Sequence, residues 1–304
     1  MEWSDRIHQD GTDQIKTKDK KAVAGCSAIC ICVVGQPLFR FIRKDRYTRY
    51  RMCEMEQQEG TRINKFLSEA GVCSRREADR ALEAGQIRIG DRVAMLGDRV
   101  RETDIVYFKG KPVCQEAERI LIAFHKPKGI VCTTSKKEGV NIVDYIGYPK
   151  RIYPVGRLDK DSTGLILLTN DGDIVNKMMR SGNRHEKEYV VTVNRDITDD
   201  FIMRMSNGVP ILDTMTRRCK VWQTGTREFR IILTQGLNRQ IRRMCETLGY
   251  RVKTLKRIRI MNINLGNLKE GSYRDVTDEE WRTLQRLIRH SSNETVKLKN
   301  DHKL

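Results

Sequence analysis

The order of strand-like and helical segments between residues 119 and 290 limits the folds open to this chain. Alternating or continuous apolar residues predict strands in "ILIAFHKPKGIVCTT", "EYVVTV", "CKVW", "FRIILT" and "IMNINL". Helical spacing predicts helices at about 173–180, 198–206, 238–248 and 277–290. These segments lack the repeated strand–helix–strand period of a doubly wound fold. The sequence therefore predicts an α+β domain with a mixed, largely antiparallel sheet and peripheral helices.

A smaller unit precedes this domain. Helical spacing starts at Thr61 and ends at Gly71, and a second helix opens at Ser74–Glu77 with the form of a capping box and stops at Gly85. Short strands follow in "QIRIGDRV" and "DIVYF". The second helix carries three arginines opposite its apolar stripe: Arg75, Arg76 and Arg80. Such a face suits either an ordinary solvated helix or an RNA-binding surface.

The remaining segments are expected to lie outside the two folded units. Residues 1–60 combine a polar start, a cysteine-rich apolar patch and the basic run "RFIRKDRYTRYR". We expect either a disordered extension or a stretch ahead of the natural start, since "MEQQEGTRINKFL" from Met55 looks like a natural beginning. The expected divisions are 61–108 for the small unit, 109–118 for a linker, 119–290 for the large domain and 291–304 for a disordered tail.

The charge balance indicates the kind of partner. Lys and Arg number 58 against 40 Asp and Glu, which gives a formal net charge of +18. A polyanion is the expected partner, with nucleic acid ahead of an anionic membrane. The longest apolar run, Ala22 to Val34, falls short of the roughly 20 residues that a spanning helix needs, so no membrane partner is expected.

The cysteines and the missing motifs limit the chemistry. Four of the nine cysteines precede Met55, and the other five are single, without a C-x-x-C pair or paired histidines. This spacing favours neither a zinc site nor a disulfide framework and fits a reducing cytoplasm. The sequence shows no phosphate-binding glycine loop, nucleotide fingerprint or serine elbow. We therefore expect no metal and no cofactor, and any catalysis must come from ordinary side chains.

Two stretches offer single residues that could act in catalysis. In "GRLDKDSTG", residues 156–164, Asp159 follows Gly-Arg-Leu directly, which suits either a carboxylate that caps a surface turn or a nucleophile. In "HEKEY", residues 185–189, Tyr189 enters a predicted strand, and the plain alternative is a half-buried strand tyrosine.

The helix predicted in "LNRQIRRMCETLG" has a defined polarity. At about 100° per residue, one side gathers Ile241, Met244, Cys245 and Leu248, and the other gathers Arg239, Arg243 and Glu246. Arg242 lies at the boundary, where an arginine can reach into a site without leaving its helix. The alternative is a basic amphipathic helix on a solvated face.

Taken together, these stretches resemble one family. "GRLDKDSTGLILLTNDG", "HEKEYVVTV" and "QGLNRQIRRM", in this order, are similar to motifs of the RNA pseudouridine synthases that modify ribosomal RNA. The flanking stretches "SGNRHEKEYVVTV" and "GVPILDTMTRRCKV" resemble a subgroup that acts on the large subunit. "RINKFLSEAGVCSRREADRALEAGQIRIG" resembles the RNA-binding module named after ribosomal protein S4, although "IGDR" stands where that module usually has Asn-Gly. The resemblance covers about residues 61–290.

The resemblance implies a reaction and roles for three residues. The reaction is isomerisation of uridine to pseudouridine in large-subunit (23S) ribosomal RNA, with a transfer RNA as a further candidate substrate, by a cofactor-free monomer. Asp159 matches the nucleophile, and Arg242 matches a cation that keeps this carboxylate ionised. Tyr189 matches a residue that lies against the uracil ring and helps to remove the C5 proton. Whether Asp159 attacks the base or the sugar, or removes a ribose proton, stays open.

The same motifs supply candidates for RNA contacts. A base inside folded RNA must be turned out of its stack before it can react, and Arg157 could fill the vacated space or hold the adjoining phosphate. The other expected contacts are Leu158, Lys160, Arg239, Gln240 and Ile241, together with Arg75, Arg76 and Arg80 of the small unit. Their alternative is ordinary solvated surface.

Two rival functions remain open from the sequence alone. A non-catalytic S4-type ribosome-assembly or rRNA-binding protein would have the same charge, but it would need no Asp159, Tyr189 and Arg242 in motif order. A glycosidase could use Asp159 and Asp161, but such enzymes need two carboxylates about 5 to 10 Å apart that face each other across the sugar.

Overall fold

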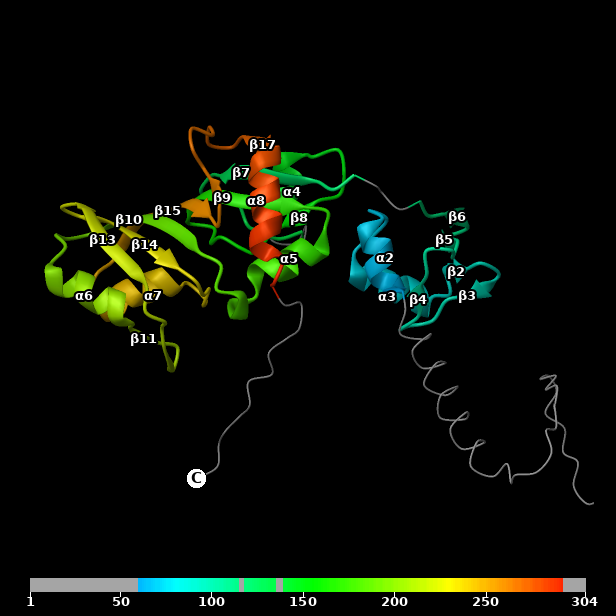
Figure 1. Cartoon of the computed structure of the whole chain (residues 1–304), viewed down its shortest axis with the longest axis horizontal. Helices are drawn as coiled ribbons and strands as arrows, with labels where there is room; N and C mark the ends of the chain where they lie inside the picture. Colours follow the sequence, from blue (N-terminus) through cyan, green and yellow to red (C-terminus); the bar gives the residue numbers. More distant parts are fainter. Residues whose placement is uncertain (1–59, 115–117, 135–138, 292–304) are drawn as a thin grey trace, which may run out of the picture. The chain divides into compact units, whose positions relative to one another are not determined.

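The computed structural model describes residues 60–114, 118–134 and 139–291 (Figure 1). The expectations for residues 1–59 and for the tail beyond residue 291 lie outside this part of the chain. Within the described ranges, none of the helices combines the length and the apolar character needed to cross a membrane.

The small unit consists of two helices and short antiparallel strands. The helices are α2 (Ile63–Glu69) and α3 (Arg75–Glu83), and β1 (Thr61–Arg62) pairs with β4 (Arg99–Val100). A four-stranded sheet has the order β3-β2-β5-β6, with bounds Arg92–Val93, Ile87–Ile89, Val106–Phe108 and Lys111–Pro112. Its core contains Ile63, Leu67, Ala78, Ile87 and Val106.

Local chemistry explains the boundaries of these elements. The Ser74 side chain accepts a hydrogen bond from the Glu77 amide and the Glu77 carboxylate accepts one from the Ser74 amide, so the predicted capping box opens α3. Gly90 and Asp91 form a two-residue turn between β2 and β3, and Gly90 has φ 56°. Glycine adopts this left-handed conformation without strain, so "IGDR" makes a tight turn despite lacking Asn-Gly.

The large domain is built on a nine-stranded sheet. The main order is β13-β14-β10-β15-β9-β7-β17, while β16 pairs with β15 and β8 pairs with β9 (Figure 1). The bounds in chain order are Leu121–Lys126 (β7), Tyr153–Pro154 (β8), Thr163–Thr169 (β9), Lys187–Val193 (β10), Lys220–Gly225 (β13), Glu228–Leu233 (β14), Val252–Ile260 (β15), Ile263–Asn264 (β16) and Tyr273–Asp275 (β17). The strands pair antiparallel except β9 with β15. The predicted mixed, largely antiparallel sheet is confirmed.

Helices pack on this sheet through two hydrophobic clusters. The helices are α4 (Ile142–Ile146), α5 (Gly172–Met179), α6 (Asp199–Asn207), α7 (Gln240–Thr247) and α8 (Asp278–Ile288), with a 3-10 turn at Ser181–Asn183 and a short hairpin, β11 (Pro210–Ile211) with β12 (Thr214–Met215). One cluster buries α6 and α7 and includes Phe201, Phe229 and Met244. The other buries α5 and α8 and includes Leu165 and Leu284. The four helices predicted in this domain are present within two residues of their expected ends.

Two strand predictions were wrong in detail. The stretch "IMNINL" is not one strand, because β15 ends at Ile260 and Met261 (φ 52°) turns the chain into the short β16. The strand predicted from "ILIAFHKPKGIVCTT" ends at Lys126, immediately before Pro127, which has no amide hydrogen for a sheet.

The longest strand, β15, was missed because its sequence, "VKTLKRIRI", places a buried arginine where alternation would require an apolar residue.

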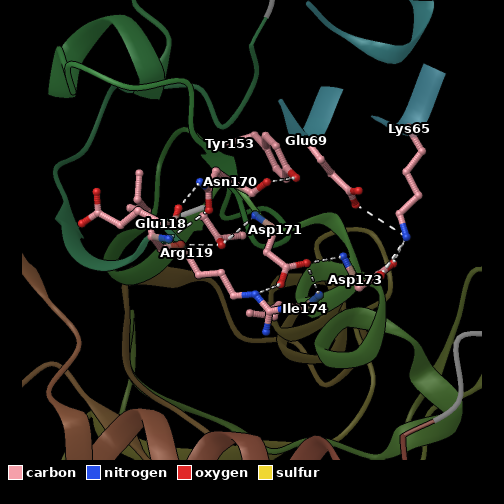
Figure 2. Close-up of polar contacts among 11 residues, drawn as sticks. Lys65, Glu69, Glu118, Arg119, Tyr153, Asn170, Asp171, Asp173 and Ile174 are labelled. Carbon is pink, nitrogen blue, oxygen red and sulfur yellow. Dashed lines mark hydrogen bonds and ion pairs between the residues drawn. The ribbon is translucent and has the colours of Figure 1, made fainter. Parts of the chain in front are cut away.

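Polar contacts connect α2 of the small unit with the large domain (Figure 2). The Lys65 ammonium lies 2.7 Å from a carboxylate oxygen of Asp173 and 3.5 Å from one of Glu69. Carboxylate oxygens of Glu69, Asp171 and Asp173 lie within 4.8 Å of one another. Burial is the main cause that raises the pKa of Glu69, and the neighbouring carboxylates add to it. The Lys65 ammonium partly neutralises this acidic group.

A glycine allows the parallel contact between β9 and β15. Gly164 has φ 109° and lies opposite Arg257 in the register. A methyl group at this position would come within 2.6 Å of the Arg257 amide nitrogen and 2.9 Å of its carbonyl carbon. Backbone atoms of a central strand cannot move away, so only glycine lets the two strands pair here.

We expect Gly164→Ala to lower the free energy of unfolding by more than about 2 kcal/mol, because it combines a steric clash with a strained backbone. Urea denaturation measures this loss. Gly225→Ala is the control, since its new methyl group would meet only the Glu228 Cβ at 3.5 Å, and its effect should stay within about 0.5 kcal/mol. Equal losses in the two variants would contradict the close-approach argument.

Candidate active site

A cavity of about 590 Å³ lies where several segments of the large domain meet. Its lining comes mainly from the loop before β9 (residues 156–160 and Ser162), from β10, from residues 233–242 and from β15, with residues 131–133 and Met179 completing it. This volume is typical of a site that encloses a small ligand or a single nucleotide-sized group.

The cavity brings together every site residue predicted in the large domain. They are Arg157, Leu158, Asp159, Lys160, Tyr189, Arg239, Gln240, Ile241 and Arg242. Residues from motifs more than 80 positions apart therefore share one site. Arg75, Arg76 and Arg80 lie on α3 of the small unit, are exposed, and do not line this cavity.

A buried lysine holds the turn that carries Asp159. The Ser162 amide donates a hydrogen bond to the Asp159 carbonyl oxygen at 3.0 Å, which closes the turn. The Lys126 ammonium is fully buried and donates to the carbonyl oxygens of Pro127 at 2.7 Å and Ser162 at 2.9 Å. Burial lowers the pKa of Lys126. These bonds fix the backbone of the turn and leave the Asp159 carboxylate free of them.

The Asp159 carboxylate lies between two arginines without a short contact to either. One carboxylate oxygen is 3.8 Å from Arg239 Nη1 and 3.9 Å from Arg242 Nε. These distances give electrostatic attraction but exceed hydrogen-bond length. The side chain is 36% exposed, so it is half-buried rather than enclosed. The arrangement keeps a negative charge in place and leaves its oxygens accessible to a ligand.

Arg242 reaches the site from the boundary of α7, as its helical position predicted. Ile241, Met244 and Cys245 are buried in the core and anchor the helix. Arg242 is 8% exposed, and its Nη2 donates to the Asp161 carbonyl oxygen at 3.3 Å and to Ser162 Oγ at 3.2 Å. The guanidinium therefore touches the turn and also faces its carboxylate.

The backbone before α7 is strained at the site. Arg239 is the N-cap of the helix and adopts φ 49° and ψ 35°, a left-handed conformation that is unfavourable for an arginine. The Gln240 side chain accepts a hydrogen bond from the Leu237 amide at 3.1 Å and stabilises this entry to the helix. The left-handed conformation turns the backbone at Arg239, the residue whose side chain lies beside Asp159.

Tyr189 faces the cavity because burial alternates along β10. Lys187, Tyr189, Val191 and Val193 are buried, while the residues between them are more exposed. Tyr189 is 9% exposed, and it lies opposite Ile231 on β14 and Arg257 on β15. An irregularity of register between Glu188 and Tyr189 sets which residue of β15 faces the tyrosine.

Two basic residues of the site were not predicted. Arg257 is 2% exposed, and its Nε donates to the Leu165 carbonyl oxygen at 2.7 Å. Lys187 is 8% exposed and also lines the cavity. Its signal was present in the sequence, because residues 187 and 189 of a strand share a face. Arg257 had no such signal, since its strand was not recognised.

Charge in the cavity is strongly unbalanced. Its described lining contains one carboxylate, Asp159, and six basic side chains: Arg157, Lys160, Lys187, Arg239, Arg242 and Arg257. An excess of this kind attracts a ligand that brings several negative charges, as a nucleic acid backbone does.

Comparison with known proteins identifies the family. A sequence model described as RNA pseudouridylate synthase matches residues 120–247, and one described as S4 domain matches residues 61–106. The chain is 53% identical over 242 residues to the "Dual-specificity RNA pseudouridine synthase RluF" of Escherichia coli (strain K12), which covers 79% of this chain and 83% of the relative. This chain belongs to the RNA pseudouridine synthase family.

Further relatives place the synthase in the branch that was expected. The same named enzyme of Salmonella typhi is 55% identical, over 77% of this chain and 82% of the relative. The "Ribosomal large subunit pseudouridine synthase B" of Bacillus subtilis is 32% identical, over 76% and 98%. A crystal structure of a pseudouridylate synthase is 27% identical with TM-score 0.55, and it covers 74% of this chain and all of that one. The predicted family, enzyme class and S4-like unit are confirmed, and the non-catalytic alternative finds no support in these matches.

Replacing Arg242 should damage this synthase more than replacing its neighbour on α7. We expect Arg242→Met to reduce single-turnover conversion of a ribosomal RNA fragment by about 100-fold or more, because it removes a cation beside Asp159 in a partly buried site. Arg243→Met is the matched control, since Arg243 bonds to Asn238 and does not line the cavity. It should stay within about threefold of the parent. Similar losses in both variants would show that the total positive charge of α7, and not the position of Arg242, supports the conversion.

Proposed function

We propose that this synthase isomerises a specific uridine of large-subunit (23S) ribosomal RNA to pseudouridine. The names of its relatives support this substrate class. Because several relatives are named dual-specificity, we also propose a second RNA substrate, for which a transfer RNA is the candidate. We propose a monomer that acts in the cytoplasm, a reducing compartment that suits the free thiols of all five described cysteines.

The observation that carries the mechanism is the half-buried but accessible Asp159 carboxylate that lies between two arginines. In the reaction the N1–C1′ bond of uridine breaks, the uracil turns within the site, and C5 bonds to C1′. The C5 proton then leaves to solvent and N1 gains a proton. Asp159 acts as the carboxylate that adds covalently or removes a ribose proton, and the cations of Arg239 and Arg242 lie beside it. These steps use only side chains of the chain itself.

The other cavity residues are assigned to contacts with the base, to contacts with the RNA phosphates, or to the cavity wall. We assign the Tyr189 ring to the face of the uracil and to help in removing the C5 proton. Arg157, Lys160 and Arg239 are exposed at the cavity and suit contacts with RNA phosphates, and Arg157 is also placed to fill the space that the turned-out base leaves. Leu158, Gln240 and Ile241 are buried, so we assign them to shaping the wall.

The division of the chain follows the same proposal. Residues 61–108 would dock RNA through the exposed Arg75, Arg76 and Arg80, residues 109–118 would connect the two units, and residues 119–290 would carry out the reaction. The pairing of Lys111–Pro112 with β5 extends the small sheet into the first part of the proposed linker.

Asp159→Asn should abolish pseudouridine formation while RNA affinity stays within about threefold of the parent. The amide keeps the size of the side chain and removes the charge used in the chemical step. Single-turnover conversion of a ribosomal RNA fragment and a binding titration of the same fragment measure the two quantities. Combining this variant with Arg242→Met should add little further loss, because both act on one carboxylate.

Asp161→Asn is the matched control for this experiment. Its side chain is exposed two residues away and does not line the cavity, so conversion should stay near the parent's. A glycosidase-like pair of carboxylates would instead require both residues. If Asp159→Asn converts uridine near the parent's rate, Asp159 has only a structural role in its turn. The proposed mechanism would then be wrong.

The small unit is tested separately through salt dependence. Replacing Arg75, Arg76 and Arg80 by glutamine should weaken binding and reduce the slope of log K against log salt by roughly 0.7 to 0.9 per lost phosphate contact. The control replaces three exposed arginines by glutamine: Arg282 and Arg286 of α8, and Arg289 at its C-cap. Equal slope changes in both triple variants would indicate net charge alone, and an unchanged slope in the first would exclude α3 from the RNA contact.

A further inference from the structure

Lys187 presents an ammonium group to the cavity without an anionic partner. It begins β10 on the same face as Tyr189 and is 8% exposed. Its Nζ donates to the backbone oxygen of His185 at 3.3 Å, and no ion pair joins it to a carboxylate among the residues that the structure describes. A buried charge without a counter-charge costs free energy. We therefore look to the bound ligand for the negatively charged group or hydrogen-bond acceptor that pairs with Lys187.

The groups packed around Lys187 make its cationic form unfavourable. Its cross-strand neighbours, Leu233 on β14 and Ile260 on β15, are apolar. The charged and titratable groups facing it are Arg257 on β15 and His185 before β10. Burial first, and then the Arg257 charge, lower the pKa of Lys187 to about 8.

The remaining charged groups of the cavity belong to the turn before β9 and to the start of α7. They are Asp159 with Arg157 and Lys160, and Arg239 with Arg242. Asp159, the one carboxylate among the described lining residues, is flanked by Arg239 and Arg242. A negative charge that develops on the ligand near β10 would therefore find Lys187 without a competing anion.

The proposed reaction generates such a charge on the uracil. Written with Asp159 attacking C1′, a C1′–O bond forms and the N1–C1′ bond breaks, with its electron pair passing to N1 and delocalising onto O2 and O4. C5 of this uracil anion then bonds to C1′ and the Asp159 carboxylate leaves. Loss of the C5 proton restores the ring and N1 is protonated. If Asp159 removes the C2′ proton instead, the same uracil anion leaves.

We propose that Lys187, as an ammonium, donates a hydrogen bond to a carbonyl oxygen of the uracil as the base departs as an anion. The inference rests on the proposed function. Residues two apart on a strand are about 7 Å apart, so with Tyr189 against the face of the ring, Lys187 can reach its edge. The interaction strengthens as the N1–C1′ bond breaks, and it therefore accelerates the chemical step rather than binding.

An RNA phosphate is a less suitable partner for this lysine. Phosphates of a bound RNA remain near solvent, where the exposed Arg157, Lys160 and Arg239 can meet them. Lys187 lies within the wall, and a base turned out of its stack is the part of the substrate that enters most deeply. The burial of Lys187 therefore favours contact with the base.

The test measures single-turnover conversion of a ribosomal RNA fragment between about pH 6.5 and 9.5, with protein in excess but below its dissociation constant. The parent's rate should fall as pH rises through about 8, because the free enzyme's ammonium loses its proton there. Lys187→Arg should stay within about tenfold of the parent at low pH and should lack this fall, since arginine remains charged. Lys187→Met should lose about 100-fold or more at pH 7.

Binding and a control variant separate a catalytic effect from a structural one. Lys187→Met should bind the RNA fragment within about threefold of the parent and with the same salt slope. Lys256→Met, on the neighbouring strand and outside the cavity lining, should retain both the parent's rate and its pH profile. Loss of affinity with a smaller salt slope in Lys187→Met would overturn the proposal in favour of a phosphate contact.

The remaining outcomes also decide the inference. A parent rate that rises through pH 8, with Lys187→Arg inactive, would show that the neutral amine acts as a base, and the proposal would be wrong. A pH profile shared by the parent and Lys187→Arg would show that the lysine does not titrate in the reaction. If Asp159→Asn is inactive but Lys187→Met matches the parent, only this inference fails. If Asp159→Asn converts uridine normally, the proposed function fails first.

Discussion

The parallel contact between β9 and β15 is the constraint on which the active site depends. In the main sheet path it is the one junction between β13-β14-β10-β15 and β9-β7-β17, and its register contains two residue pairs, Lys256 with Thr163 and Arg257 with Gly164. The Asp159 turn precedes β9, while Tyr189 and α7 belong to the other side of this junction. The cavity therefore lies across a seam, and the absence of a side chain at Gly164 sets how closely its two walls approach.

The buried basic side chains of the cavity are held in place by hydrogen bonds to the backbone. Backbone oxygens accept these bonds: Arg242 is held by that of Asp161, Arg257 by that of Leu165 and Lys187 by that of His185. Hydrogen bonds to carbonyl groups hold these cations in place without neutralising them. The site thus keeps a positive potential around Asp159, the single carboxylate of its described lining and the reactive group of the proposed mechanism.

The sequence predicted the parts of the molecule whose signals are local. The capping box of α3 and the polarity of α7 could be read from residue order and spacing, while the meeting of motifs around Asp159 was expected only from the family resemblance. Strand β15 could not be predicted, because its buried Arg257 is stabilised by the Leu165 carbonyl oxygen, a partner 92 residues away. The place of Lys187 in the cavity likewise depends on strand pairing, although its motif was recognised. The open geometry of the Asp159 carboxylate depends on distances between segments, which no residue pattern contains.

The left-handed backbone at Arg239 has a consequence for engineering the stability of this protein. An arginine in this conformation costs on the order of 1 kcal/mol relative to a residue that tolerates it, and glycine or asparagine would suit the position better. Substitutions chosen for thermal stability alone would therefore favour those residues and would remove the positive charge beside Asp159. Under the proposed mechanism, stability and activity make opposite demands on this position. A stabilising redesign that follows this mechanism would leave Arg239 unchanged.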